Sequence, residues 1–155
     1  MSKNTKTARR AKHERNNGAY FNRENMYISG LFSSKKSRGK LRYRSSYEKY
    51  FMMLLEEDDN VLSFVSEPLG IRYVDAEKNQ RTYIPDILIL YADGSTELVE
   101  IKPKRMLKAN NVRRKAAAAQ RFLMKFHPET RFRFVTEDDI FDNLEDYKSK
   151  VKESR

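Results

Sequence analysis

The chain has 155 residues, and the absence of cysteine excludes disulfides, thiolate zinc sites and a cysteine nucleophile. Hydrophobic residues make up 39% and charged residues 35%, which predicts one soluble domain with a modest core and no membrane-spanning segment. Only two histidines and no glycine-rich phosphate loop are present, which disfavours a zinc site, a histidine-based triad and nucleotide hydrolysis. The first 18 residues lack the apolar stretch of a secretory signal, so we expect a cytoplasmic protein.

The net charge of +10 is distributed unevenly along the chain. Residues 1–45 carry 13 Lys/Arg and 2 acids, whereas residues 46–155 carry 19 Lys/Arg and 20 Asp/Glu. This asymmetry predicts a basic, partly disordered arm over residues 1–44 and a folded domain over residues 45–150. The arm would bind DNA by neutralising phosphates and releasing counterions, although a solubilising tail or an arm for an acidic protein surface has the same charge.

Apolar periodicity predicts the secondary structure of the domain in chain order. A helix begins near Ser45 or Ser46, where large apolar residues recur at helical spacing. Short strands follow, in VLSFVS, LGIRYV and RTYIPDILILY, and the ADGS turn leads into TELVEIKPK. A second helix over roughly residues 108–126 is followed by the strand RFRFVT, and Thr136 is the expected N-cap of a final helix. Because a helix connects the hairpin to the last strand, we expect an α/β (α+β) fold with a mixed central sheet flanked by helices.

The hairpin YIPDILILYADGSTELVEIKPK carries polar side chains on segments that are otherwise apolar. Side chains alternate along a strand, so Glu100 and Lys102 point to the same face, and the hairpin brings them alongside Asp86. Pro85 cannot donate a ladder hydrogen bond, which predicts a bulge or an edge position just before Asp86. Two neighbouring buried carboxylates repel each other, and magnesium, which prefers oxygen ligands, would relieve that repulsion. The residues alone leave a second interpretation open, in which Asp86 and Lys102 form a cross-strand ion pair and Glu100 faces solvent.

Basic residues follow the hairpin and continue along the second helix. They would hold DNA phosphates near a cut site or form a solvated helix face, and the sequence favours neither interpretation. The candidate DNA-binding residues are Lys104, Arg105, Lys108, Arg113, Arg114 and Arg121. The inner face of the same helix is expected to consist of Val112, Ala116, Ala119, Leu123 and Phe126.

The spacing of the polar residues in the hairpin resembles a known signature. Pro85-Asp86 is followed, after 13 residues, by Glu100-Ile101-Lys102, as in the PD-(D/E)XK nuclease superfamily. The resemblance covers roughly residues 42–141, and two branches of the superfamily are especially similar to this sequence. These are the N-terminal nuclease domain of TnsA endonucleases from transposons and the head-completion nucleases of tailed phages. The resemblance implies a restriction-endonuclease-like fold and a magnesium-dependent DNA endonuclease, with manganese as an alternative ion.

The resemblance also implies a role for individual residues. Asp86, Glu100 and a further carboxylate on the leading helix, matched by Glu48, would bind the metal, and Lys102 would be the catalytic lysine. Glu48 has a structural alternative, because Ser45-Ser46-Tyr47-Glu48 fits a capping box in which the glutamate returns to the N-cap amide. We favour the metal role, and the two roles are compatible.

The biological context is left open between the two branches. TnsA continues into a second domain, so the short length and the basic arm favour phage head completion and genome packaging over transposon-end cleavage. The expected partners are DNA and either phage head and neck proteins or a transposase, in the cytoplasm or in the virion, and a homo-oligomer is compatible with each. A third interpretation is a non-catalytic DNA-binding or assembly protein that keeps the fold, but the presence of all four expected site residues favours catalysis.

Deletion of residues 1–18 tests the assignment of the arm. Because fewer phosphate contacts release fewer counterions, the truncated protein should bind duplex DNA more weakly, with a shallower dependence of log K on log[salt]. Fluorescence anisotropy over a range of salt concentrations measures both quantities. An unchanged salt dependence would mean that the arm binds something other than phosphates.

Overall fold

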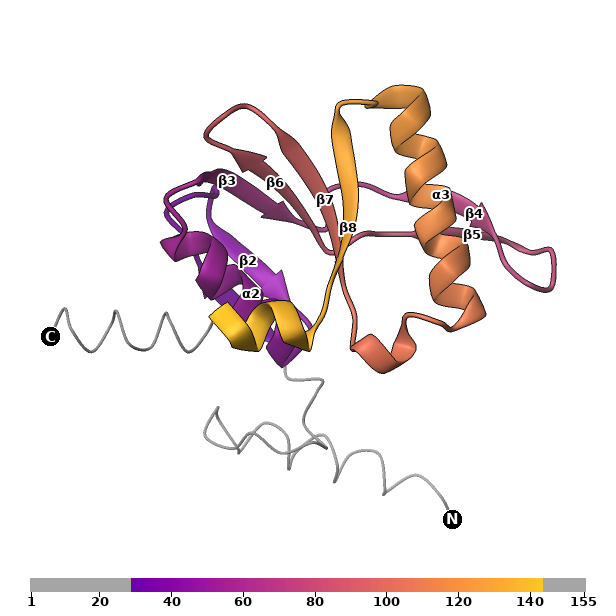
Figure 1. Ribbon diagram of the computed structural model, residues 1–155, viewed down its shortest axis with the longest axis horizontal. Coiled ribbons are helices and arrows are strands. Elements are labelled where there is room, and N and C mark those ends of the chain that lie inside the picture. Colours follow the sequence, from indigo (N-terminus) through magenta and orange to yellow (C-terminus); the bar gives the residue numbers. More distant parts are fainter. Residues whose placement is uncertain (1–28, 144–155) are drawn as a thin grey trace, which may run out of the picture.

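The computed structural model describes residues 29–143, which contain a four-stranded central sheet and two smaller sheets (Figure 1). The central sheet has the strand order β3 (Val61–Ser66), β6 (Ile87–Tyr91), β7 (Thr96–Ile101) and β8 (Thr130–Val135). β6 runs antiparallel to both β3 and β7, whereas β8 runs parallel to β7. The predicted mixed sheet is therefore confirmed.

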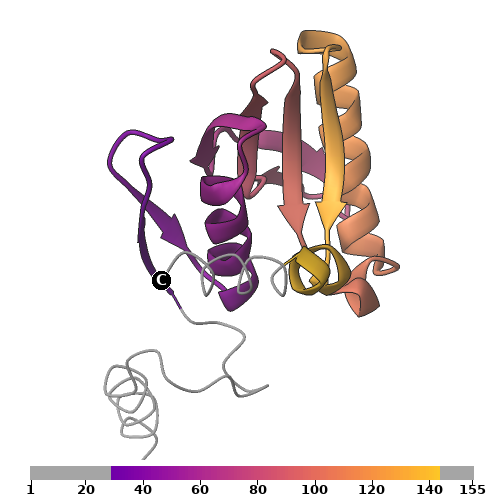
Figure 2. The same ribbon diagram turned by 60° about the vertical axis from the view of Figure 1, so that its left-hand side comes forward.

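Helices cover both faces of this sheet (Figure 2). α2 (Ser46–Glu57) packs on the face that contains Val99, and α3 (Asn110–Phe126) packs on the face that contains Leu98. Successive strand residues point to opposite faces, so the apolar run of β7 fills two core clusters rather than one. Covering on both faces explains why β6, in the middle of the sheet, is apolar at nearly every position.

The predicted helices are present, with differences at their ends. α2 begins after Ser45, whose hydroxyl accepts a hydrogen bond from the amide three residues later, as an N-cap does. α3 begins later than expected because a short 3₁₀ helix, η2 (Lys104–Met106), precedes it. The assignment of Phe126 to the inner face is wrong: it is the last residue of α3, beyond the buried cluster, and is 57% exposed. No helix within residues 29–143 has the length and apolarity needed to cross a membrane.

Part of the expected arm is folded. β1 (Gly30–Ser33) and β2 (Lys40–Tyr43) form a two-stranded sheet, and Leu41 and Tyr43 are buried in the core cluster on the α2 side. The folded region therefore begins upstream of the expected boundary. Two four-residue strands are too short to give an apolar period that can be recognised in the sequence. The remainder of the arm, residues 1–28, lies outside the described residues.

The segment RTYIPDILILY, expected as one strand, forms two strands in different sheets. β5 (Gln80–Tyr83) pairs with β4 (Ile71–Val74) in a ribbon that packs on α3, whereas β6 belongs to the central sheet. The interruption contains Pro85, which has no amide hydrogen to donate to a ladder. The irregularity predicted just before Asp86 is thus a complete break between strands.

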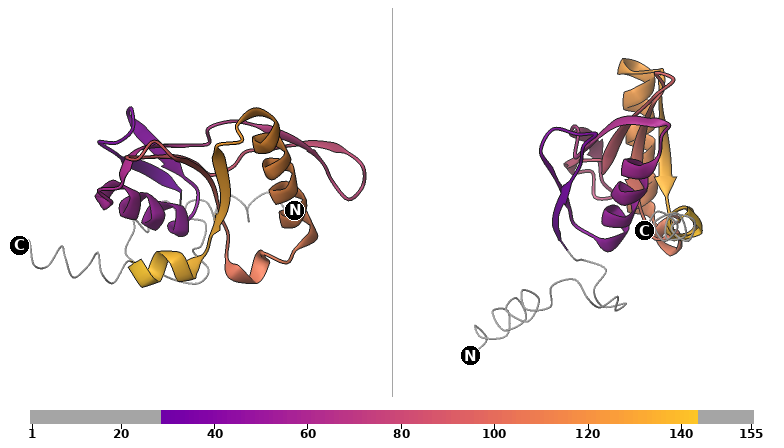
Figure 3. Two further views of the ribbon diagram at one scale, coloured as in Figure 1. Left: turned by 45° about the horizontal axis from the view of Figure 1, so that its top comes forward. Right: turned by 90° about the vertical axis from the view of Figure 1, so that its left-hand side faces the viewer.

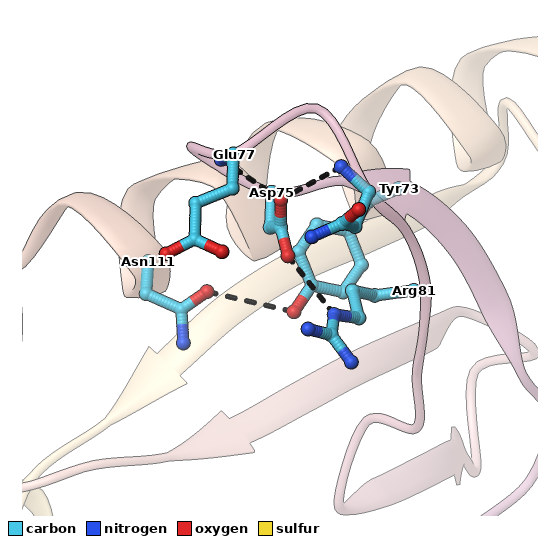
Figure 4. A network of polar contacts seen from close by, with 6 residues as sticks. Tyr73, Asp75, Glu77, Arg81 and Asn111 are labelled. Atoms are coloured by element: carbon cyan, nitrogen blue, oxygen red, sulfur yellow. Dashed lines mark hydrogen bonds and ion pairs between the residues drawn. The ribbon is translucent and has the colours of Figure 1, made fainter.

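The turn of the β4–β5 ribbon is fixed by polar contacts around Asp75 (Figure 4). Asp75 Oδ1 accepts a hydrogen bond from the Glu77 amide at 2.9 Å, and Oδ2 accepts one from Arg81 Nε at 2.9 Å. The Tyr73 hydroxyl lies 3.5 Å from Asn111 Oδ1 in the first turn of α3. These contacts hold the ribbon in shape and join it to the helix.

A last helical segment, residues 137–143, follows β8 (Figure 3). The Thr136 amide donates to Asp139 Oδ2 at 2.9 Å, which is the reciprocal half of a capping box. The predicted helix start is therefore confirmed. The rest of the expected helix lies outside the described residues.

Candidate active site

Asp86 and Glu100 face each other at one end of the central sheet. The β6–β7 ladder ends at the pair Ile87–Val99, beyond which Asp86 and Glu100 follow on the two segments. The charge of Glu100 acts on Asp86, so the two carboxylates lie within electrostatic reach of each other. The Asp86 amide donates to the Val99 carbonyl at 3.1 Å, and Asp86 Oδ2 accepts a hydrogen bond from the Ile101 amide at 2.7 Å. The hairpin therefore brings the two predicted carboxylates together.

Burial raises the pKa of both carboxyl groups. Burial is the main cause of the raised pKa of Asp86, and the negative charges of Glu100 and Glu48 raise it further. Glu100 is only 5% exposed, and burial raises its pKa as well, against the lowering effect of a hydrogen bond from Tyr83 and of the Lys102 charge. Ionising both groups therefore costs free energy, and a nearby cation would offset this cost because it favours the ionised forms.

Lys102 lies beside Glu100 rather than beside Asp86. Its Nζ is 3.4 Å from Glu100 Oε1, and its side chain is 27% exposed. The Lys102 amide donates to the Val135 carbonyl at 2.9 Å, so β8 fixes the backbone directly after β7. The interpretation in which Glu100 faces solvent is wrong, because this carboxylate is buried between its strand neighbours.

Glu48 forms a modified helix cap near the carboxylate pair. Its amide donates to Ser45 Oγ at 3.2 Å, and its Oε2 accepts from the Arg44 amide at 2.9 Å, one residue before the N-cap. Burial raises the pKa of Glu48, and the charge of Glu100 contributes to the increase. Glu48 thus lies within electrostatic reach of the pair while serving as a cap, and its role as a metal ligand stays a prediction.

The three carboxylates do not form a complete metal cage. Within residues 29–143, no group of three or more His, Cys, Asp or Glu side chains is arranged to hold a metal ion. Magnesium, however, commonly takes only one or two carboxylates and completes its shell with waters and phosphate oxygens. Asp86 and Glu100 fit such an ion, because they are hard oxygen donors that are buried together and repel each other.

Tyr83 and Lys115 belong to the site but were not recognised in the sequence. The Tyr83 hydroxyl donates to Glu100 Oε2 at 2.6 Å, and Tyr83 is 3% exposed. Lys115 Nζ lies 5.6 Å from the centroid of the Tyr83 ring, and its charge lowers the pKa of Glu100. A large aromatic residue at the end of the polar strand QRTY is a sequence signal for burial, but the partner of Tyr83 depends on how the ribbon packs.

The loop after β3 fixes the backbone of Asp86. The Glu67 amide donates to the Asp86 carbonyl at 2.8 Å, and Glu67 has a φ of 49°, a left-handed conformation that is uncommon outside glycine. The Glu67 carboxylate forms an ion pair with Arg44 at 2.5 Å. Glu67 therefore contributes its amide to the site, whereas its side chain is directed to the residue before the α2 cap.

The candidate DNA-binding residues are all exposed, and Lys104 has protein partners. Lys104 Nζ contacts Asp138 Oδ2 at 2.9 Å, and the Lys104 amide donates to Glu137 at 2.8 Å, which joins η2 to the last helical segment. Exposed ion pairs of this kind contribute little stability. The exposed set consists of Lys104, Arg105, Lys108, Arg113, Arg114 and Arg121.

A mixed sheet flanked by helices, with a half-buried and a buried carboxylate and a lysine at the ends of adjacent strands, is the arrangement of a restriction-endonuclease-like protein. A family model described as TnsA-like endonuclease N terminal matches residues 58–137, more than half of the chain. The chain therefore belongs to the family of TnsA-like endonuclease N-terminal domains. Asp86, Glu100 and Lys102 lie within the matched residues, whereas Glu48 precedes them.

The head completion nuclease of Enterobacteria phage T4 is a curated relative. The two proteins are 36% identical over 87 residues, which cover 52% of this chain and 58% of the phage protein. The chain thus spans less than two thirds of the length of that relative. Both similarities confirm the resemblance found in the sequence.

The isosteric substitution Asp86→Asn should stabilise the protein at pH 8 in the absence of divalent cations. The pKa of Asp86 is raised in the folded state. At a pH between the ordinary carboxyl pKa and this raised pKa, the folded protein therefore holds a proton that is released on unfolding. The free energy of unfolding consequently falls as pH rises through this range. Asparagine removes this cost and can still accept the Ile101 hydrogen bond. We expect Tm to rise by several degrees, since about 1 kcal/mol shifts Tm by roughly 2–8 °C in domains of this size.

Calorimetry as a function of pH checks this expectation. The gain should disappear below about pH 4, where the carboxyl is also protonated in the unfolded chain. The control is Asp93→Asn, because hydrogen bonds from Ser95 lower the pKa of the exposed Asp93 and its removal should not stabilise the protein. A lower Tm of Asp86→Asn at pH 8 contradicts the argument.

The substitution Tyr83→Phe should raise the pKa of Glu100 further, because it removes a hydrogen bond to the ionised carboxylate. A pH titration of the side-chain carboxyl carbons by NMR measures this shift. Tyr91→Phe is a matched control, since the Tyr91 hydroxyl donates to Glu97 Oε1 at 2.7 Å in the same hairpin. If both variants leave the titration of Glu100 unchanged, the contact with Tyr83 does not tune this carboxylate.

Proposed function

We propose that this protein is a divalent-metal-dependent DNA endonuclease that hydrolyses phosphodiester bonds. The observation that carries the proposal is the pair of half-buried Asp86 and buried Glu100 with Lys102 at its side, in a chain of the TnsA-like endonuclease N-terminal family. Buried acids that repel each other are costly to maintain for stability alone, and perturbed pKa values of this kind are typical of functional sites.

Magnesium is the proposed ion, with manganese as the alternative, and Asp86 and Glu100 would hold it. When bound, such an ion polarises a phosphodiester and lowers the pKa of a coordinated water. Glu48 would act as a third, more distant carboxylate, consistent with its electrostatic interaction with the pair.

Lys102 is the proposed catalytic lysine. Its ammonium lies at the partly exposed rim of the pair, where it can orient a water or stabilise the negative charge that develops on the phosphate oxygens. Tyr83 orients the Glu100 carboxylate through its hydroxyl, and the Ile101 amide orients Asp86. The Glu67 amide holds the Asp86 backbone in place, so each acid is fixed by at least one neighbour.

The substrate is proposed to be DNA, bound through phosphates by the basic residues after β7 and on α3. Lys108, Arg113, Arg114 and Arg121 are exposed and available for such contacts. Phosphate contacts of this type fix the position of the duplex without reading its sequence. The basic residues at positions 1–28, which precede β1, would add to this affinity.

Phage head completion is the favoured process, because a head completion nuclease is among the relatives. Phage head and neck proteins would then be the protein partners. Cleavage of transposon ends together with a transposase is the second candidate, which the family description supports. A non-catalytic DNA-binding role is disfavoured because both acids and the lysine are retained in contact.

The substitutions Asp86→Ala and Lys102→Ala should each reduce magnesium-dependent nicking of supercoiled plasmid by at least about a hundredfold, the usual cost of losing a group that stabilises the transition state. DNA binding in EDTA, measured by fluorescence anisotropy, should remain close to that of the parent. The matched controls remove exposed charges elsewhere: Asp93→Ala, in the β6–β7 turn at the end of the hairpin opposite to the site, and Lys40→Ala, in β2.

The substrates for this assay are duplex, branched and single-stranded DNA, with magnesium or manganese. If the parent cuts none of them, the proposed activity is wrong. If the parent cuts but both site variants cut equally well, the activity is present and the assignment of the residues is wrong.

A further inference from the structure

A groove of about 440 Å³ lies between the β4–β5 ribbon and α3, away from the carboxylate pair. Arg72 and Ile71 of β4 form one wall, and α3 forms the other. The α3 residues that line it are Ala118, Arg121, Phe122 and Lys125. Buried Ile71 and Ala118, together with the Phe122 ring, give the groove an apolar floor below a basic rim.

All the charged residues that line this groove are basic. Arg72, Arg121 and Lys125 are exposed, and within residues 29–143 none of them takes part in an ion pair. By contrast, Arg44, Arg81 and Arg133 each have a carboxylate partner. Three cations without counter-charges around one groove favour a polyanionic ligand, because binding would release their counterions.

The position of the groove relative to the site suits a DNA backbone. Lys115, whose charge acts on Glu100, lies near the start of α3, and Arg121 and Lys125 follow six and ten residues later on the same helix. At 1.5 Å per residue these positions lie about 9 and 15 Å further along the helix axis. Each strand of B-DNA rises about 3.4 Å per nucleotide, so this distance corresponds to roughly three to four base pairs.

We propose that the groove between β4 and α3 binds the DNA phosphate backbone about three to four base pairs from the bond that is cut. This inference rests on the proposed function and adds Arg72 and Lys125 to Arg121, which the proposed function already assigns to DNA phosphates. Arg72 distinguishes this groove from a basic face of α3 alone, because Arg72 lies on the β4–β5 ribbon rather than on the helix. The two walls would hold the backbone from both sides, with the apolar floor against the sugars.

The test compares two full-length triple variants that each lose three positive charges. The groove variant carries Arg72→Gln, Arg121→Gln and Lys125→Gln, and the control carries Lys35→Gln, Arg38→Gln and Lys40→Gln between and within β1 and β2. Binding to a 20-base-pair duplex is measured in EDTA by fluorescence anisotropy at several KCl concentrations. The groove variant should bind at least tenfold more weakly at low salt, and the slope of log K against log[salt] should fall by about 2.7 if three contacts are lost.

The control should change the affinity and the slope much less than the groove variant. Equal losses in the two variants would show an effect of net charge alone and overturn the groove as a binding site. Because the chain has no cysteine, Lys125→Cys can also carry a single photo-crosslinker, with Lys40→Cys as its control. Crosslinking of duplex from position 125 and not from position 40 supports the groove even if the triple variant is unstable, and the reverse result overturns it.

This experiment separates the groove from the proposed activity because it needs neither metal nor cleavage. A protein that binds DNA through the groove but never nicks it contradicts the endonuclease and leaves the groove in place. A protein that nicks DNA and is indifferent to the groove substitutions contradicts the groove alone.

Discussion

The burial of Asp86 beside Glu100 is the constraint on which the rest of the site depends. Apolar clusters on both sides of the sheet keep water from screening the repulsion between these carboxylates. The protein reduces the cost with three donors: the Ile101 amide, the Tyr83 hydroxyl and the Lys102 ammonium. The pKa of each acid nevertheless stays raised, so the site retains an affinity for further positive charge.

The fold supports this arrangement by bringing several elements to one end of the sheet. The hairpin of β6 and β7 supplies the facing acids, and β8 fixes the backbone at Lys102 through its parallel pairing with β7. The turn after β3 fixes Asp86 from the other side. Side chains held by regular strands keep their relative positions more closely than side chains on loops, which is what a reaction at one phosphodiester requires.

The hairpin, its acids and Lys102 could be predicted from the sequence because their signals are local. Alternation along two strands joined by a short turn fixes which side chains meet, and the Asp86 to Lys102 spacing resembles a known signature. The capping position of Glu48 was visible for the same reason, since a cap involves residues within one helical turn.

Other parts of the site depend on contacts that no local pattern contains. The partner of Tyr83 is 17 residues away, and the contribution of Lys115 depends on how α3 lies against the ribbon. The break at Pro85 was expected as an irregularity, but its consequence, two strands in different sheets, follows from the pairing of β5 with β4. The strands within the expected arm were missed because they are short and lie in a segment rich in basic residues, and because they are stabilised by packing against the core on the α2 side.

The separation of β5 from the central sheet has a mechanical consequence. Tyr83 reaches Glu100 from a ribbon that is anchored to α3, and hydrogen bonds weaken steeply once the donor and acceptor move apart by a few tenths of an ångström. A small rigid-body shift of that ribbon would misorient the glutamate while every ladder of the four-stranded sheet stayed intact. Loss of alignment at this carboxylate can therefore occur without any measurable melting, and the hinge for it is the three-residue link that contains Pro85.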